Sequence, residues 1–302
     1  MAASTSHLDY PLKLFNEGLH TKLDDFKLQK YLIQQLNYNQ TDASILVNEI
    51  TSVVREDKNS VFWTAVEERK APHLVNVMLQ SVDPSERLRF IQIQAGEDDD
   101  LFDIAQRHLE TFRQILQSVS NDDERLQLLQ MKDIIDWTVL HHAAVYSAAT
   151  EIVHVILESV SEEICYTLLG MEDNVKYTPI HIACMQTNYE VLEMMIRLIT
   201  VEEMRYNLLQ LPSVFGYTPL HLSALHDHTQ HIRVIADSVT SQQLIHLLRI
   251  TDDERSTPLQ LAARYNHQAT VELLQDYQTK ALIDVALRQT NVSGENFTYY
   301  PG

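Results

Sequence analysis

Histidine, cysteine and acidic residues are the side chains of this chain best suited to metal binding or catalysis. The chain has 14 histidines but only two cysteines, Cys165 and Cys184. Four histidines gather within one short stretch: His221, His226, His228 and His231. Their spacing is not that of paired zinc ligands, and neither cysteine lies near them in the sequence. We therefore expect no metal site.

Acidic runs are the second candidate for chemistry. Residues 97–100 and 252–254 each hold several carboxyl groups, and both runs lie at turns or helix starts, where acids complement the helix dipole. General acid–base catalysis needs a pocket that shifts pKa values. The sequence also lacks a phosphate-binding glycine-rich loop and a Gly-X-Ser-X-Gly elbow. We expect no catalytic residue, no cofactor and no enzyme activity.

A repeat organises the chain around these residues. Stretches of the type Thr-Pro-Leu-His begin at Thr138, Thr178, Thr218 and Thr257, spaced 40, 40 and 39 residues apart. A threonine can cap a helix whose first residue is proline. After Thr178 a short helix with small apolar residues is predicted, and a second apolar-faced helix follows from Val191 to Ile196. Such a period predicts a stacked solenoid.

These stretches resemble the ankyrin repeat. The resemblance is clear from about Asp133 to Asp276 and weaker upstream, and it predicts about six units, starting near positions 60, 99, 138, 178, 218 and 257. It implies an all-α solenoid that binds other proteins. It also implies that His141, His181 and His221 hydrogen-bond the backbone of neighbouring turns.

The repeat departs from the ankyrin pattern in two ways. Its period exceeds the usual length of about 33 residues, and helix-start signals at Ser120, Thr200 and Thr240 predict a third short helix in most units. Glycine usually stands two residues before the threonine, but only Gly216 does so here. The other units have Asp136, Lys176 and Arg255 there, which weighs against the usual tight turn.

The repeat suggests three regions. Residues 1–56 contain two amphipathic patterns and are expected to form an N-terminal helical cap or a degenerate repeat. Residues 57–288 are expected to form the array, and Ala281–Arg288 is expected to cap its other end. Residues 289–302 are expected to be a mobile tail.

Partner binding is expected at the turn tips and first-helix ends that ankyrin proteins use. The three central units carry apolar or aromatic residues there, whereas the outer units are mostly charged. The candidate partner-binding residues are Ile135, Trp137, Tyr146, Val175, Tyr177, Met185, Phe215, Tyr217, Leu225 and Tyr265. Two interpretations stay open: an exposed binding surface, or side chains that simply pack over the turns.

Charge and composition limit the classes of partner and the compartments that we expect for this protein. A net charge of −19 disfavours nucleic acid and anionic membrane and favours a protein partner that is basic or has an exposed apolar segment. The sequence has no run of about 18 apolar residues, so we expect no membrane insertion. Few cysteines and no secretory signal indicate the cytoplasm, with the nucleus as the alternative. The oligomeric state stays open.

The resemblance favours a scaffold or adaptor, and other functions stay open beside it. The chain could be the regulatory ankyrin region of a larger signalling or channel assembly, or an effector directed at a host. The N-terminal helices could also hold an unrecognised enzyme function, because a fold alone does not establish function.

Overall fold

The computed structural model describes residue 79, residues 101–119, 121–133 and 135–146, and residues 150–294. The expected N-terminal cap, the unit starting near position 60 except for residue 79, and the end of the expected tail, residues 295–302, lie outside these ranges. The chain divides into two compact units, Met1–Met131 and Lys132–Gly302. That division falls within the range 57–288 expected to form one array, and each unit is described by itself.

The described part of the first unit is one set of three helices. It consists of α7 (Leu101–Arg107), α8 (Leu109–Ser118) and α9 (Asp122–Leu129). α7 packs against α8, whose Phe112 and Ile115 are fully buried. The cap of α9 is Asn121, whose side chain accepts the N–H of Glu124 at 2.9 Å, so this helix begins one residue later than the signal at Ser120 predicts.

The second unit repeats a similar set with a constant order of helices. The first helices are α10 (Val139–Val145), α13 (Pro179–Met185), α16 (Pro219–Leu225) and α19 (Pro258–Arg264). The second helices are α11 (Thr150–Glu158), α14 (Tyr189–Arg197), α17 (Thr229–Asp237) and α20 (Gln268–Gly294). The third helices are α12 (Glu162–Leu169), α15 (Glu202–Leu209) and α18 (Ser241–Arg249). Every regular element among the described residues is a helix.

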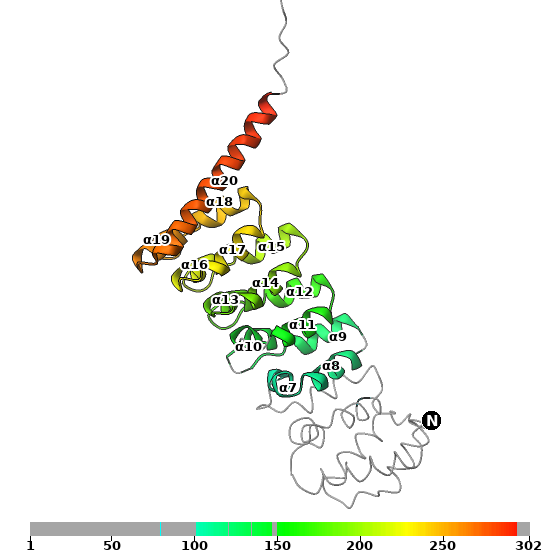
Figure 1. Ribbon diagram of the computed structural model, residues 1–302. Helices are drawn as coiled ribbons and strands as arrows, with labels where there is room; N and C mark the ends of the chain where they lie inside the picture. Colours follow the sequence, from blue (N-terminus) through cyan, green and yellow to red (C-terminus); the bar gives the residue numbers. More distant parts are fainter. Residues whose placement is uncertain (1–78, 80–100, 120, 134, 147–149, 295–302) are drawn as a thin grey trace, which may run out of the picture. The chain divides into compact units, whose positions relative to one another are not determined.

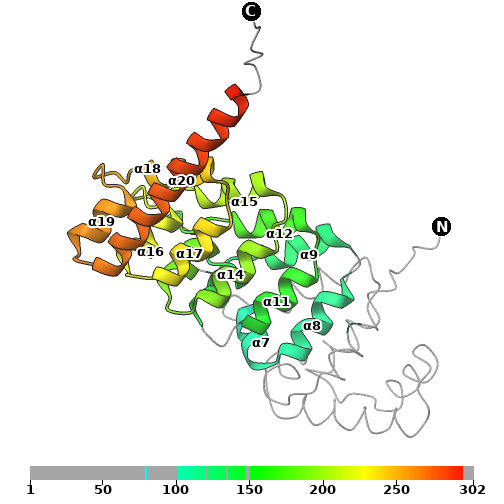
Figure 2. The ribbon, with the colours of Figure 1, turned by 45° about the horizontal axis from the view of Figure 1, so that its top comes forward.

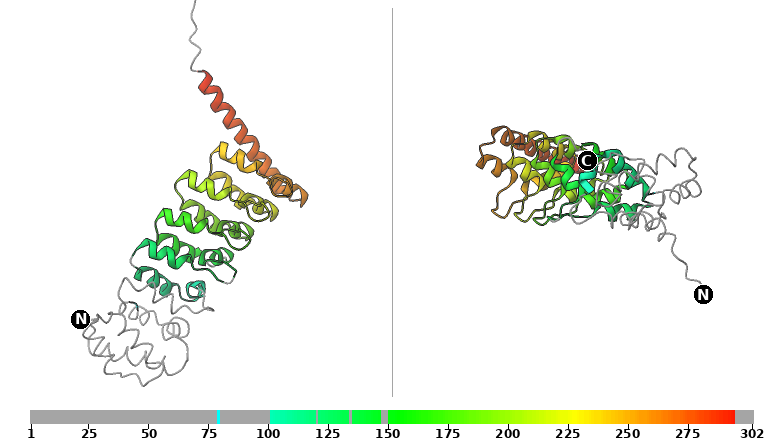
Figure 3. Two further views of the ribbon diagram at one scale, coloured as in Figure 1. Left: turned by 180° about the vertical axis from the view of Figure 1, so that it is seen from behind. Right: turned by 90° about the horizontal axis from the view of Figure 1, so that it is seen from below.

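Equivalent helices of this second unit stack in rows. α10, α13, α16 and α19 pack one on the next, and so do α11, α14, α17 and α20, as Figures 1 and 3 show. The core between the rows consists of small and branched side chains such as Ala183, Leu192, Ala224 and Ile232, all fully buried. Small residues allow the short first helices to approach closely, and the stack buries faces that no single set could bury alone.

The first helices begin as the sequence predicts. Thr138, Thr178, Thr218 and Thr257 each cap one of them in a reciprocal capping box, and proline starts three of the four. The partner in the box is the histidine three residues on, or Gln260 in the last set. In each box the side chain three residues on accepts the N–H of the threonine, and the hydroxyls of Thr178 and Thr257 also accept an N–H of the helix.

The third helices are confirmed, but their starts follow different rules. Thr240 forms the expected capping box with Gln243. Thr200 does not cap α15, which begins after Val201; this prediction was wrong. Its N–H and hydroxyl instead donate to Glu162 of the preceding set, at 2.5 and 2.9 Å. The N–H of Val201 donates to the same carboxylate at 2.9 Å, so a side chain 39 residues away caps this helix.

The last helix is longer than the sequence predicts. α20 runs from Gln268 to Gly294 without a break, so the second helix of the last set and the expected cap over 281–288 are one helix. The helix also continues past position 288, where the array was expected to end. Its buried residues Leu273, Leu274 and Ala281 lie on the side that packs on α17, α18 and α19, and its end extends beyond α18 (Figure 2).

The turns before the first helices keep the tight geometry that the missing glycines had put in question. Asp136, Lys176 and Arg255 adopt φ of 64°, 59° and 62°, next to 74° for Gly216. In each turn the N–H of this left-handed residue donates to the carbonyl three residues earlier, at 2.9–3.1 Å. The expectation of altered turns was wrong, and the reason lies in side chains at the base of each turn.

Candidate functional site: a groove between two turns

An acidic or hydroxyl side chain at the base holds each turn closed. Oδ1 of Asp173 accepts the N–H groups of Val175 and Tyr177, at 2.9 and 2.8 Å. Oδ1 of Asp133 accepts the two equivalent N–H groups of its own turn. The Ser213 hydroxyl accepts the N–H groups of Phe215 and Tyr217, at 3.3 and 3.2 Å. In the last turn Asp252 accepts the N–H of Ser256 at 2.7 Å. These bonds offset the cost of a left-handed residue other than glycine.

Buried histidines link each first helix to the next turn. Nε2 of His141 bonds the carbonyl oxygen of Tyr177 at 3.0 Å, and Nε2 of His181 bonds that of Tyr217 at 3.1 Å. His221 bonds the carbonyl oxygen of Ser256 at 3.1 Å. A carbonyl only accepts, so Nε2 carries the proton and Nδ1 is left to accept from the capping threonine. The structural role that the resemblance implies for these histidines is confirmed.

Burial sets the charge of these three imidazoles. Desolvation lowers the pKa of His141, His181 and His221 to about 4, although their bonds to backbone carbonyls act in the opposite direction. The rings are therefore neutral near pH 7 and serve as hydrogen-bonding links between neighbouring sets of helices.

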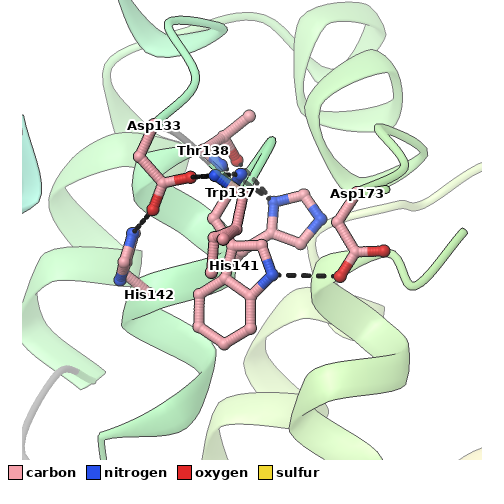
Figure 4. Close-up of polar contacts among 7 residues, drawn as sticks. Asp133, Trp137, Thr138, His141, His142 and Asp173 are labelled. Carbon is pink, nitrogen blue, oxygen red and sulfur yellow. Dashed lines mark hydrogen bonds and ion pairs between the residues drawn. The ribbon is translucent and has the colours of Figure 1, made fainter. Parts of the chain in front are cut away.

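Trp137 joins the first two turns through its ring. Its Nε1–H donates to Oδ2 of Asp173 at 3.0 Å, and its indole stacks over His141 with ring centroids 6.3 Å apart (Figure 4). The other carboxylate in this view, Asp133, pairs with Nε2 of His142 at 2.9 Å. Trp137 is thus fixed between two turns rather than free in solvent.

The backbone leaves an opening between these same two turns. Val214 N–H donates to the Val175 carbonyl at 3.1 Å, and Asp253 N–H donates to that of Phe215 at 3.2 Å. These bonds tie the turns starting at Ser213 and Asp252 to the turn before each. Within the described residues no such backbone bond joins the turn of Asp133 to the turn of Asp173.

A groove of about 420 Å³ lies at this opening. Its walls come from two consecutive sets of helices and their turns. The lining residues are Ile135, Trp137, Val145, Asp173, Asn174, Val175, Tyr177, Ile182, Met185 and Gln186. Most of them are apolar or aromatic, and among the described residues that line the groove Asp173 is the charged one. The groove has the size and lining of a site for one large side chain or a short peptide segment.

The structure brings five of the ten sequence-predicted residues together at the groove. These are Ile135, Trp137, Val175, Tyr177 and Met185. The other five lie elsewhere: Tyr146 follows α10, Phe215 and Tyr217 belong to the next turn, Leu225 ends α16, and Tyr265 follows α19. The ten predicted residues do not include five others that line the groove from helix ends, the middle of α13 and the turn between them: Val145, Asp173, Asn174, Ile182 and Gln186.

The predicted residues divide into side chains that pack over the turns and side chains that are exposed. Tyr177 and Tyr217 are half-buried, and their rings lie 5.9 and 6.2 Å from those of His181 and His221. These tyrosines, like Trp137, pack over the turns. Phe215, in contrast, is 52% exposed. Tyr146, Tyr265 and, at the rim of the groove, Ile135 are also exposed.

Of the other candidates for chemistry, the acidic run at residues 97–100 lies outside the described residues. Within the described ranges, no group of three or more histidine, cysteine, aspartate or glutamate side chains is placed to hold a metal ion. His228 bonds the carbonyl of Cys184 through Nδ1 at 3.0 Å and stacks on His231 at 4.8 Å. Burial raises the pKa of the Cys184 thiol to about 12, so this thiol is unreactive near neutral pH. None of the described helices is long and apolar enough to cross a membrane.

Comparison with known protein families identifies part of the stack. Residues 196–286 match the model described as ankyrin repeats (3 copies), which confirms the resemblance seen in the sequence. The match covers the later sets of helices, and the groove lies upstream of it. A search of curated proteins finds no match to the chain. Ankyrin repeats generally mediate protein–protein interaction and are typically not enzymes.

Proposed function

Because the chain carries ankyrin repeats, matched over residues 196–286, we propose that it is a scaffold or adaptor that captures a partner protein at the groove between its turns. One observation supports this above others. Five residues chosen for their repeat positions line a single open groove with few polar groups. Exposed apolar concavities with a polar rim are the usual anchoring points of protein interfaces.

The wider contact surface continues along the turn tips. Phe215, Tyr146 and Tyr265 are exposed and lie at the turns or at first-helix ends. A partner anchored in the groove would reach them by running across successive sets of helices, as solenoid partners do. We propose a signalling role in the cytoplasm, supported by two buried cysteines that form no disulfide and so suit a reducing compartment.

Peptide display tests the proposed function. The protein is immobilised and used to select binders from a random 12-residue peptide library, and each binder is measured by fluorescence polarisation. The groove variant Ile135→Ser/Met185→Ser removes two apolar walls that are not fully buried, so its fold is retained. The control Tyr189→Ser/Val201→Ser removes two exposed apolar side chains away from the groove.

The proposal expects selected peptides to lose at least tenfold in affinity on the groove variant and to bind the control as they bind the wild type. Equal binding to all three proteins would move the site away from the groove. Circular dichroism of each variant verifies that the helices are intact.

A further inference from the structure

Asp173 is the charged side chain among the described residues that line the groove. Asp173 is 7% exposed and accepts three hydrogen bonds, from the N–H groups of Val175 and Tyr177 and from the Trp137 indole. All three donors are uncharged. Within the described residues no lysine or arginine pairs with this carboxylate, so its negative charge is solvated by dipoles alone. A buried charge of this kind attracts a cation strongly, because little water screens it.

The surroundings of the groove add to that charge. The two bordering turns and the residues just before them carry Asp133, Asp136, Glu172 and Asp173, against Lys132 and Lys176. The ammonium of Lys132 is already engaged, since it donates to the backbone carbonyl of Glu172 at 2.8 Å. The local excess of carboxylates has the same sign as the net charge of −19. A basic group is therefore favoured both on approach and after binding.

A side chain that fits the groove must match its walls as well as its charge. Ile135, Val175 and Met185 present aliphatic surface, and Trp137 and Tyr177 present aromatic surface. Asn174 and Gln186 bring amide groups to the same site, and their oxygens can accept hydrogen bonds. The site thus suits a side chain with a long apolar stem and a cationic, multiply donating head.

Arginine combines these properties. Its methylene stem packs on apolar surface while its head stays polar. Its planar guanidinium stacks on aromatic rings, carries five N–H donors and is more weakly hydrated than an ammonium group. We propose that the groove binds an arginine side chain of an extended segment in the partner protein, with the charge of Asp173 and its neighbours as the attraction. This inference rests on the proposed function and specifies the chemistry of the partner.

Matched peptide pools test the inference. Four pools of the form acetyl-X-X-Z-X-X-amide, with X any residue except arginine, lysine, aspartate, glutamate or cysteine, carry arginine, lysine, citrulline or norleucine at Z. Citrulline keeps the shape of arginine without its charge, and norleucine keeps only an apolar stem. Binding of each pool is followed by the indole resonance of Trp137. We expect the arginine pool to bind at least tenfold tighter than the citrulline and norleucine pools, and tighter than the lysine pool.

Two charge variants separate local from overall attraction. Asp136→Asn/Glu172→Gln removes two carboxylates beside the groove, at residues that are exposed or half-exposed. Glu163→Gln/Glu190→Gln removes the same charge from exposed positions on α12 and α14. We expect only the first pair to weaken the arginine pool, and neither pair to change the norleucine pool.

Other outcomes separate the inference from the proposed function. If norleucine binds as tightly as arginine and Ile135→Ser/Met185→Ser abolishes both, the groove is a binding site and the arginine assignment is overturned. If both charge variants weaken the arginine pool equally, the attraction belongs to the whole protein and the assignment is also overturned. If no pool distinguishes the wild type from the groove variant, the proposed function itself fails.

Discussion

The buried histidines should make this array sensitive to mild acid, and the effect can be isolated at His221. Burial lowers its pKa from 6.5 to about 4, against the opposing effects of the Ser256 carbonyl and the charge of Asp252. Between those two pH values the unfolded chain takes up a proton that the folded chain excludes. The stabilisation is therefore complete above pH 6.5 and is lost as the pH falls toward 4.

The magnitude follows from the two pKa values. For one histidine with these values, the free energy of unfolding falls by about 2 kcal/mol between pH 7.5 and pH 5. Glutamine is the appropriate replacement, because Gln260 occupies the same place in the last set, where its Oε1 accepts the N–H of Thr257 at 2.9 Å. His221→Gln keeps the capping box and removes the titration.

Urea unfolding followed by circular dichroism, at pH 7.5 and at pH 5, measures the difference. The free energy of unfolding of His221→Gln should fall by about 2 kcal/mol less than that of the wild type over this range. The control is His154→Gln, at a side chain 53% exposed on α11, and it should follow the wild type. An equal fall for wild type and His221→Gln would refute the assignment of a buried neutral imidazole.

Three further perturbations test the scaffold. Glu162→Ala should lower the melting temperature, because the N–H groups at the start of α15 lose their acceptor, whereas Glu163→Ala should not; calorimetry that ranks the two equally would contradict this. Gly216→Ala should destabilise the protein by about 1–2 kcal/mol in urea titrations, since φ is +74° and a Cβ would lie 2.8 Å from the Asp253 amide nitrogen; an unchanged midpoint would argue against the turn geometry. Cys165 and Cys184 should react with a maleimide only after unfolding, and rapid labelling of the native protein would disprove their burial.

Local signals were enough to predict most of the fold. The threonine and proline at the start of each first helix are read correctly because their capping bonds span three residues. The third helices follow from the apolar pairs that their last turns bury, such as Leu168 and Leu169 in α12. The unbroken α20 was not predicted, although the sequence allows it, since no glycine or proline separates the two predicted segments.

One error of prediction comes from a contact between sets of helices, and another from a local signal that was overlooked. The sequence around Thr200 resembles a helix cap, but its hydroxyl and N–H donate hydrogen bonds to Glu162 of the preceding set. The turns looked unable to close without glycine, and the signal that explains them is the Asp or Ser five residues before each threonine, as at Asp173 and Ser213. That pattern repeats in the sequence and can be used to recognise such turns.

The candidate site was predictable in composition but not in shape. Repeat positions identified Ile135, Val175 and Met185 as surface candidates. They do not show that, in the part of the chain that the structure describes, the turns of Asp133 and Asp173 share no backbone bond like those that join the later turns. Nor do they show that the indole of Trp137 reaches Asp173. Both depend on side chains and backbone about 40 residues apart, so only the folded stack brings them together.

The central claim is that a partner segment occupies the groove, and the indole N–H of Trp137 reports on it directly. The chain has two tryptophans, so Trp63→Phe leaves a single indole resonance, that of Trp137. Titrating this protein with a display-selected peptide while recording nitrogen–proton spectra gives the answer. We expect the Trp137 resonance to shift and to saturate with the affinity measured by polarisation. A resonance that stays in place while the peptide binds would contradict it.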